Sequence, residues 1–186
     1  MQLNLASEKC FVLNIGKHQD TSTPNFYLDG QQLSTEIVAK DLGINVTQSL
    51  KWEYHINYLF KIGSQISYQI KKSFKTKNIW TLLKLYLTYF IRPKMEYNSP
   101  VWSPYLKKDI IKLEAIQRSF TKFACLRCSI LFSSYQDRLY KLNLKTLEYR
   151  RAVFDLIFLF KIIRGETNLL FSDFFREKKL AFYTKG

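Results

Sequence analysis

Side chains that could do chemistry are few and scattered in this sequence. It contains no GxSxG, no Walker-type glycine loop and no HExxH, so these local signatures of hydrolases, P-loop nucleotidases and zinc peptidases are missing. Two histidines, His18 and His55, are far apart in the chain. A catalytic histidine needs further groups converging on the same reacting atom. We therefore interpret both as structural or solvated rather than catalytic.

The cysteines give half of a metal-binding pattern. Cys125 and Cys128 have the CxxC spacing of one zinc-ligand pair, and the remaining candidates are Cys10 and the two histidines. A structural zinc site normally takes four ligands, and no second pair is present. We interpret Cys125 and Cys128 as small apolar residues on a buried helix face, and predict no metal site.

Carboxylate pairs, which metal-assisted nucleotidyl transfer requires to hold two divalent ions, are also missing. Asp109 and Glu114 lie among lysines, Asp41 directly follows Lys40, and no Asp-Asp pair occurs. The chain alone is therefore predicted to be inactive as a catalyst and to carry no cofactor.

The location is predicted from cysteine usage and hydropathy. Three cysteines, an odd number, argue against a disulfide framework and for a reducing compartment. The opening residues have no positive start followed by an apolar core, so no signal peptide is expected. The longest apolar run, AVFDLIFLFKII, contains Asp155 and Lys161 and is typical of a core helix rather than a membrane span. We expect an intracellular protein, cytoplasmic or nuclear and not secreted, without a membrane partner.

Basic charge is the strongest compositional signal. The formal net charge is +14, and residues 1–50 contribute −2 of it, so residues 51–186 contribute +16. Such a balance favours an anionic partner, nucleic acid or an acidic membrane surface. Lysines alternate with aromatic rings that could stack on bases or sugars. The candidate nucleic-acid-binding residues are Lys61, Lys71, Lys72, Lys75, Lys77, Lys108, Lys112, Arg118 and Lys122. Composition alone supports a structural alternative equally well, in which the rings form a core and the lysines keep a helical bundle soluble.

The elements that must position these residues change type near residue 50. Residues 1–50 predict short strands at 10–16, 25–30 and 36–46, with a tight turn at Asp29-Gly30, as a piece of a larger sheet. From residue 51 the apolar residues recur at steps of three and four, which predicts a long helix. Gly63 lies within that apolar stripe and is tolerated there if another backbone passes close. Residues 78–90 are apolar nearly all round and should form the most buried helix.

Prolines interrupt the helical pattern in the connector, residues 91–105. Pro93 and Pro100 push the residues before them out of the helical region, so Arg92 and Ser99 are expected to be extended. Further helices are predicted at 106–128, 135–140 and 147–164, and a basic tail at 171–186. The predicted fold class is mostly α with a small N-terminal β-rich unit.

A resemblance to a known family enters at the proline connector. Residues 91–122, IRPKMEYNSPVWSPYLKKDIIKLEAIQRSFTK, resemble a segment near the C-terminal end of reverse transcriptases from jockey-like non-LTR retrotransposons. The family pattern reads R-P-x-x-E-Y-x-x-x-x-W-x-P followed by D-I-x-x-L-E-x-x-Q-R. Its residues fall here on Arg92, Pro93, Glu96, Tyr97, Trp102 and Pro104, and then on Asp109, Ile110, Leu113, Glu114, Gln117 and Arg118. Residues 4–16, 40–56 and 135–165 resemble further family segments in the same order.

The resemblance implies where these residues would lie in such an enzyme. Residues 1–50 would be the β-rich end of the palm, with incomplete palm hairpins. Residues 51–90 would form thumb-like helices, 91–105 the connector, 106–170 a post-thumb helical region and 171–186 the basic tail. The catalytic aspartates, with their Mg²⁺, would belong to a part preceding Met1, and that part would be a binding partner of this chain. Lys9 would match a palm lysine proposed to assist nucleotide addition, and Leu42-Gly43 would belong to the hairpin that steadies the primer end. The connector residues Arg92, Pro93, Glu96, Tyr97, Trp102 and Pro104 would be structural, with Tyr97 and Trp102 filling the joint.

Three functional hypotheses follow. The first is a fragment of an RNA-directed DNA polymerase that grips template–primer nucleic acid without regard to sequence. The second is a non-functional remnant of a transposable element. The third is a helical protein-interaction module, whose binding should persist in salt that abolishes nucleic-acid contacts.

Overall fold

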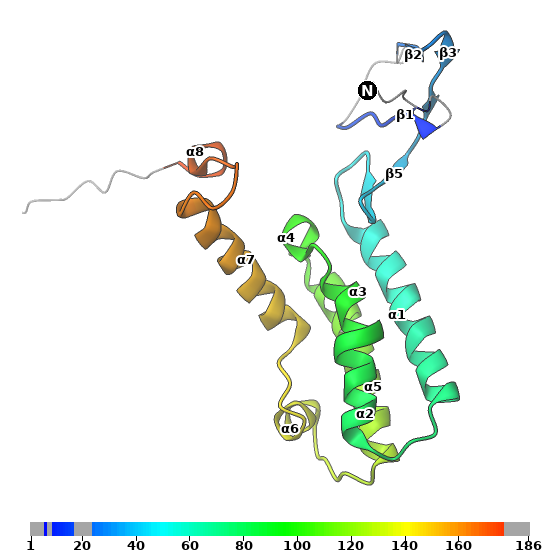
Figure 1. Ribbon diagram of the computed structural model, residues 1–186, viewed down its shortest axis with the longest axis vertical. Coiled ribbons are helices and arrows are strands. Elements are labelled where there is room, and N and C mark those ends of the chain that lie inside the picture. The colour runs from blue at the N-terminus through cyan, green and yellow to red at the C-terminus, as the bar shows by residue number, and fades with distance from the viewer. Residues whose placement is uncertain (1–5, 7–8, 17–23, 177–186) are drawn as a thin grey trace, which may run out of the picture.

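The computed structural model describes residues 6, 9–16 and 24–176. The chain is mostly helical, with small two-stranded sheets near its N-terminus. Figure 1 shows the β elements at one end of the molecule, the long helices α1 and α5 in its body, and α7 diverging from that body.

The described strands form three separate pairs. β1 (Phe11–Val12) runs parallel to β4 (Ser34–Thr35), β2 (Tyr27–Leu28) is antiparallel to β3 (Gln31–Gln32), and β5 (Val38–Asp41) is antiparallel to β6 (Ile44–Thr47). The predicted turn at Asp29-Gly30 is confirmed, because both residues have positive φ (50° and 78°), as a two-residue hairpin of this kind requires. The strands predicted at 10–16 and 25–30 are shorter than their patterns suggest.

Two long helices form the centre of the body. α1 (Glu53–Ser73) and α5 (Lys107–Arg127) run side by side in the same direction, since Lys108 bonds Glu53 near their starts and Arg127 bonds Phe74 near their ends. The predicted α1 stripe is buried at Ile56, Leu59, Gly63 and Ile70. The close neighbours of Gly63 are side chains, not the backbone that its sequence position suggested. A Cβ there would lie 2.8 Å from Ile116 Cδ1 and 3.2 Å from Met95 Cε.

The segment predicted as the most buried helix is only half buried. It begins as α2 (Ile79–Lys84), whose first turn is capped by Asn78 Oδ1 accepting from the amides of Trp80 and Thr81, and it continues as a π-helix, η2 (Leu85–Phe90). Leu82, Leu83, Leu85 and Tyr86 are buried, but Trp80 and Tyr89 are 68% and 65% exposed. The prediction of a fully buried helix was wrong because the apolar composition of a helix does not determine how many neighbouring elements cover it.

The proline connector is helical, not extended as predicted. Arg92 begins α3 (Arg92–Glu96) and Ser99 begins α4 (Ser99–Trp102), with a proline at the second position of each. A proline is accepted in a first helical turn, because the N–H that it lacks would have no partner there. The bend between the two helices is made by Asn98, whose φ is +51°.

Trp102 fills the joint of the connector and Tyr97 does not. The Trp102 side chain is fully buried, and its Nε1 donates to the Tyr97 carbonyl at 2.8 Å. The Tyr97 ring is 57% exposed, which corrects the expectation that it packs in the joint. Pro104 is buried and Pro93 is exposed.

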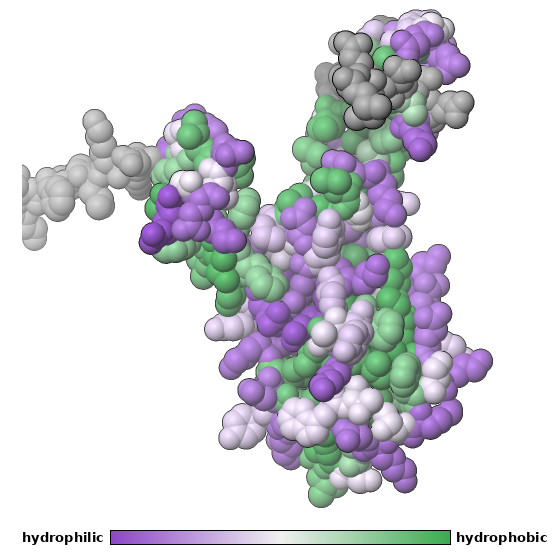
Figure 2. All heavy atoms as spheres, viewed as in Figure 1, coloured by the Kyte–Doolittle hydropathy of each residue, from purple (hydrophilic) through white to green (hydrophobic). Residues whose placement is uncertain are grey.

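The helices predicted at 135–140 and 147–164 begin at the expected residues, each after a side chain that caps it. α6 (Tyr135–Lys141) follows Ser134, whose Oγ accepts from the Asp137 amide, and α7 (Leu147–Ile163) follows Thr146, whose Oγ1 accepts from the Tyr149 amide. Gly165, with φ of +67°, follows the end of α7. The short α8 (Phe171–Phe174) comes last among the described elements. Figure 2 shows hydrophobic side chains in green along the arm made by α7 and α8.

Two carboxylates attach α7 to the body. Glu114 on α5 accepts from the Leu147 amide at 2.9 Å, from Gln117 Nε2 at 3.2 Å and from the Tyr135 hydroxyl. Glu96 on α3 receives two bonds from the Arg150 guanidinium, at 2.5 and 2.8 Å. Burial, followed by the bond to Glu114, raises the pKa of Tyr135 above its usual range. Both carboxylates belong to the motif carried by residues 91–118.

No helix within the described ranges is long and apolar enough to cross a membrane.

Candidate nucleic-acid interface

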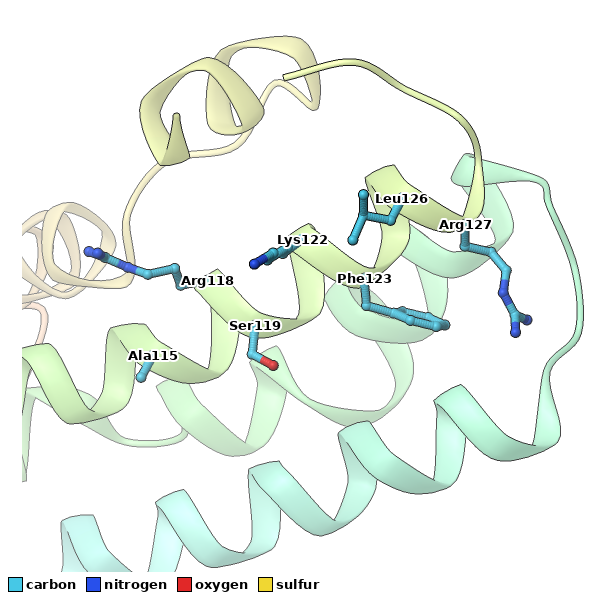
Figure 3. Close-up of a pocket in the computed structure, with 7 residues that line it drawn as sticks. All are labelled: Ala115, Arg118, Ser119, Lys122, Phe123, Leu126 and Arg127. Atoms are coloured by element: carbon cyan, nitrogen blue, oxygen red, sulfur yellow. The ribbon is translucent and has the colours of Figure 1, made fainter. Parts of the chain in front are cut away.

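An open groove with a volume of about 720 Å³ follows the second half of α5. Three of its lining residues are cationic and none is acidic; they are Ala115, Arg118, Ser119, Lys122, Phe123, Leu126 and Arg127. Figure 3 shows Ser119 and Phe123 on the side of α5 that faces α1, with Arg118 and Lys122 extending from the other side. A polyanion entering this groove would therefore meet only positive charge from its lining.

The C-terminal end of α1 closes one side of the groove. Lys71 Nζ donates to Ser119 Oγ at 3.3 Å and lies 5.4 Å from the centre of the Phe123 ring. Arg127 donates to the Phe74 carbonyl at 3.1 Å and lies 5.2 Å from the same ring. Burial lowers the pKa of Lys71. These contacts hold two cations beside a ring whose negative face attracts them.

Arg118 and Lys122 are the exposed cations of the groove. They lie one helical turn apart, which is about 6 Å along the axis, and both are exposed. The Arg118 guanidinium lies 4.6 Å from the centre of the Tyr135 ring. Among the described residues Lys122 has neither an ion pair nor a hydrogen bond from its side chain. Both can therefore reach a phosphate without first breaking a salt bridge.

Three further predicted lysines are exposed near the end of α1. Lys72 lies in its last turn, and Lys75 and Lys77 lie in the loop that leads to α2. Since Phe74 in that loop is bonded to Arg127, the loop sits at the same end of the body as the groove. α1 ends at Ser73, so Lys75 and Lys77 lie beyond the helix.

The structure does not bring all nine predicted cations together. Lys108 forms an ion pair with Glu53 at 2.8 Å, and Lys112 bonds Asn57 Oδ1 and lies over the Phe60 ring. The Glu53 carboxylate raises the pKa of Lys108. Lys108 is separated from Lys122 by 14 residues of helix, which is roughly 21 Å. Lys108 and Lys112 therefore connect α5 to α1 instead of lining the groove.

Lys61 lies outside the groove, whereas Arg127, which was not predicted, lines it. Lys61 is exposed on α1 and is not among the lining residues. Arg127 was missed by the sequence analysis, because helical spacing from Arg118 and Lys122 places it toward α1. The signal that could have found it is its place in the last turn of α5, where a basic side chain bonds free carbonyl groups.

The candidates for catalysis or metal binding remain apart. Within the part of the chain that the structure describes, no three His, Cys, Asp or Glu side chains come together as a metal site. Cys125 is buried and Cys128 partly so, and burial raises the pKa of both thiols. Lys9 is exposed beside the short β1 strand, and the expected role of His18 lies outside the described residues.

His55 has a structural position beside a second hollow. Its Nδ1 accepts from the Asn45 amide at 3.2 Å, and its ring meets Trp102 edge-on at 5.1 Å. The side chain is 2% exposed, and burial lowers its pKa to about 4. The hollow, of about 420 Å³, also includes Leu42, Gly43 and Tyr97 in its lining. His55 thus connects the β5–β6 hairpin, α1 and the connector as a neutral ring.

Comparisons with known proteins identify no family. No family model matches the chain, and no solved structure matches it significantly. A Caenorhabditis elegans protein described as uncharacterized protein B0403.1 is 29% identical to it over 126 residues, which are 68% of this chain and 63% of the relative. The chain therefore spans less than two thirds of the length of that relative.

Proposed function

We propose that this chain is the thumb-like part of a reverse transcriptase of the non-LTR retrotransposon kind, and that it binds a template–primer duplex through the α5 groove. The groups that join nucleotides would lie in another part of the polymerase. On this proposal the chain contributes affinity for the duplex without sequence preference, and Mg²⁺ chemistry belongs to the part that carries the catalytic aspartates.

The observation that carries the proposal is the groove itself. Arg118, Lys122 and Arg127 line it with no acidic residue among the lining positions. Phosphate contacts supply most of the affinity of sequence-indifferent binding. The 6 Å or so between Arg118 and Lys122 along the helix spans about two nucleotide rises of 3.4 Å. One strand of a duplex lying along α5 would thus present phosphates two nucleotides apart to the two side chains.

The family-like motif supports the proposal independently of charge. Its residues Trp102, Glu96 and Glu114 are the ones that hold the connector, α5 and α7 together. A pattern shared with a family because of a common fold would place its residues at such junctions. The resemblance and the internal contacts are therefore consistent with each other.

Fluorescence anisotropy on a labelled RNA–DNA duplex tests the proposal. Replacing Arg118 and Lys122 by Gln should weaken binding at least tenfold at fixed salt, because two phosphate contacts are lost. The control, with Lys94 and Lys161 replaced by Gln, has the same net charge and should change binding less than threefold. Equal losses in the two variants would place the duplex elsewhere, and a wild-type preference for one duplex sequence would exclude backbone binding.

The exposed surface of α7 supports a second candidate function, binding to another protein. α7 exposes several large apolar side chains, among them Leu156 and Phe160, which favours a helical protein-interaction module. Binding of a protein partner in salt that abolishes duplex binding would support that function.

A further inference from the structure

α7 carries a second apolar stripe on the side opposite its contact with the body. Its inner side is buried at Leu147, Arg151 and Ile162. The outer stripe follows alternating steps of four and three residues, through Tyr149, Val153, Leu156, Phe160 and Ile163. Such spacing is typical of a coiled-coil seam. No charged residue occupies a position in the stripe.

The outer stripe is in contact with solvent. Leu156, Phe160 and Ile163 are 65%, 55% and 59% exposed, and Tyr149 is 57% exposed. An ordinary surface helix is polar on its outer face, so an uncharged outer seam indicates that another helix covers it.

The apolar area fits an interface between two proteins. A large side chain has roughly 150–250 Å² of surface, so five half-exposed ones on α7 (the four above and Ile157) contribute on the order of 500 Å². Leu170, Phe174 and Phe175, which follow α7 and are also exposed, raise the total to roughly 800 Å². That is about one partner's share of a standard interface.

The charges beside the stripe suit a second copy running parallel. One edge carries Arg150 and Arg164, and the other carries Ala152 and Leu159. In a parallel pair the arginine edge of one helix lies against the apolar edge of the other, so no like charges meet. An antiparallel pair would instead place Arg150 beside Arg164 of the second copy. Arg150 is paired with Glu96 and Arg164 with Glu166, so the repulsion that opposes an antiparallel pair is reduced rather than absent.

We propose that this chain forms a parallel homodimer through the outer stripe of α7. A second copy supplies the same uncharged seam at the same spacing, and it completes the area that a stable dimer needs. The body of each copy lies on the opposite side of its α7, which leaves the stripe accessible to the other copy.

Sedimentation equilibrium of the full chain tests the proposal after nuclease treatment and in about 0.5 M salt, where duplex bridging is screened. The wild type is expected to be a dimer at tens of micromolar. A variant with Leu156→Glu and Phe160→Glu should be monomeric and keep the helical circular dichroism of the wild type, since both positions are exposed, and its unfolding temperature should no longer depend on protein concentration. The control, Leu131→Glu with Tyr140→Glu, changes two residues that are each 87% exposed outside the stripe, and it should stay dimeric.

Further arms keep the proposal falsifiable. Phe160→Ser, a milder change, should weaken dimerisation at least tenfold. Ile163→Cys, introduced with Cys10 and Cys128 replaced by Ser, should form an intermolecular disulfide under mild oxidation, because parallel seams place identical positions opposite each other. A wild type that is monomeric at about 100 µM, or a dimer that survives the Leu156 and Phe160 changes, would overturn the interface. A dimer without the Ile163→Cys cross-link would overturn the parallel arrangement.

Discussion

Replacing Glu114 by Gln should release the start of α7 from α5. The carboxylate accepts from the Leu147 amide at one oxygen, and from Gln117 and the Tyr135 hydroxyl at the other. A glutamine side chain has one acceptor oxygen and one donor NH₂. Whichever way the amide turns, a donor faces a donor at one of these positions, so at least one bond to a buried charged group is lost.

The cost follows from the bonds affected. A hydrogen bond to a charged group contributes about 1.5–3 kcal/mol, and an unsatisfied buried donor costs a similar amount. We expect Glu114→Gln to lower the free energy of unfolding by about 2–4 kcal/mol. That is a large fraction of the roughly 5–15 kcal/mol typical of a folded domain.

Urea unfolding and hydrogen exchange measure this effect together. The exchange of the Leu147 amide and of the first turn of α7 should accelerate more than that of the middle of α1. Glu148→Gln is the matched control, because it makes the same charge change at an exposed position in that turn, and it should cost less than about 1 kcal/mol. If both variants lose the same stability, Glu114 does not hold α7 and the reasoning fails.

Three further predictions concern the body. Replacing His55 by Gln should flatten the pH dependence of stability between pH 6.5 and 4: burial keeps the folded pKa at about 4, so the unfolded chain binds the proton first and wild-type stability falls as pH drops through that window. Urea titration at each pH measures the free energy of unfolding. Between pH 6.5 and 4 the wild type should lose about 2 kcal/mol more of it than the variant, after allowance for solvent screening, and parallel curves would contradict this. Gly63→Ala should destabilise by about 1 kcal/mol, since its Cβ would meet Ile116 Cδ1 at 2.8 Å; adding Ile116→Val should recover part of the loss in the same unfolding assay, and no recovery would show that another contact is responsible. Glu96→Gln should cost about 1–3 kcal/mol because the bidentate bond with Arg150 is broken; an unchanged thermal midpoint would show that this pair is dispensable.

Local signals in the sequence predicted much of the fold. Ser134 and Thr146 mark the starts of two helices because their hydroxyls bond amides only three residues away. Asp29-Gly30 marks a turn for a similarly local reason. Such features depend on a few consecutive residues and need no tertiary information.

Features that depend on distant partners could not be predicted in this way. The prolines of the connector restrict the residues before them, yet Pro93 and Pro100 fit first helical turns whose packing is fixed by Trp102. Exposure of Trp80 and Tyr97 depends on which helices happen to cover them. Residue type alone gives no measure of that coverage.

The candidate interface was predicted in part for the same reason. The spacing of Arg118 and Lys122 places them on one face of a helix whatever the tertiary structure is. Lys108 and Lys112 meet Glu53 and Asn57, each 55 residues away, so their separation from the groove appears only in the fold. Whether Arg127 lines the groove likewise depends on the end of α1, because Arg127 bonds the Phe74 carbonyl there.

The salt dependence of duplex binding tests the central claim most directly. Each phosphate neutralised contributes about 0.9 to the slope of log affinity against log salt for duplex DNA. Replacing Arg118, Lys122 and Arg127 by Gln should therefore reduce the wild-type slope by about 2–3, whereas a charge-matched variant with Lys51, Lys107 and Lys161 replaced should reduce it by less than about 1. A groove variant that keeps the wild-type slope would show that a polynucleotide does not bind along α5.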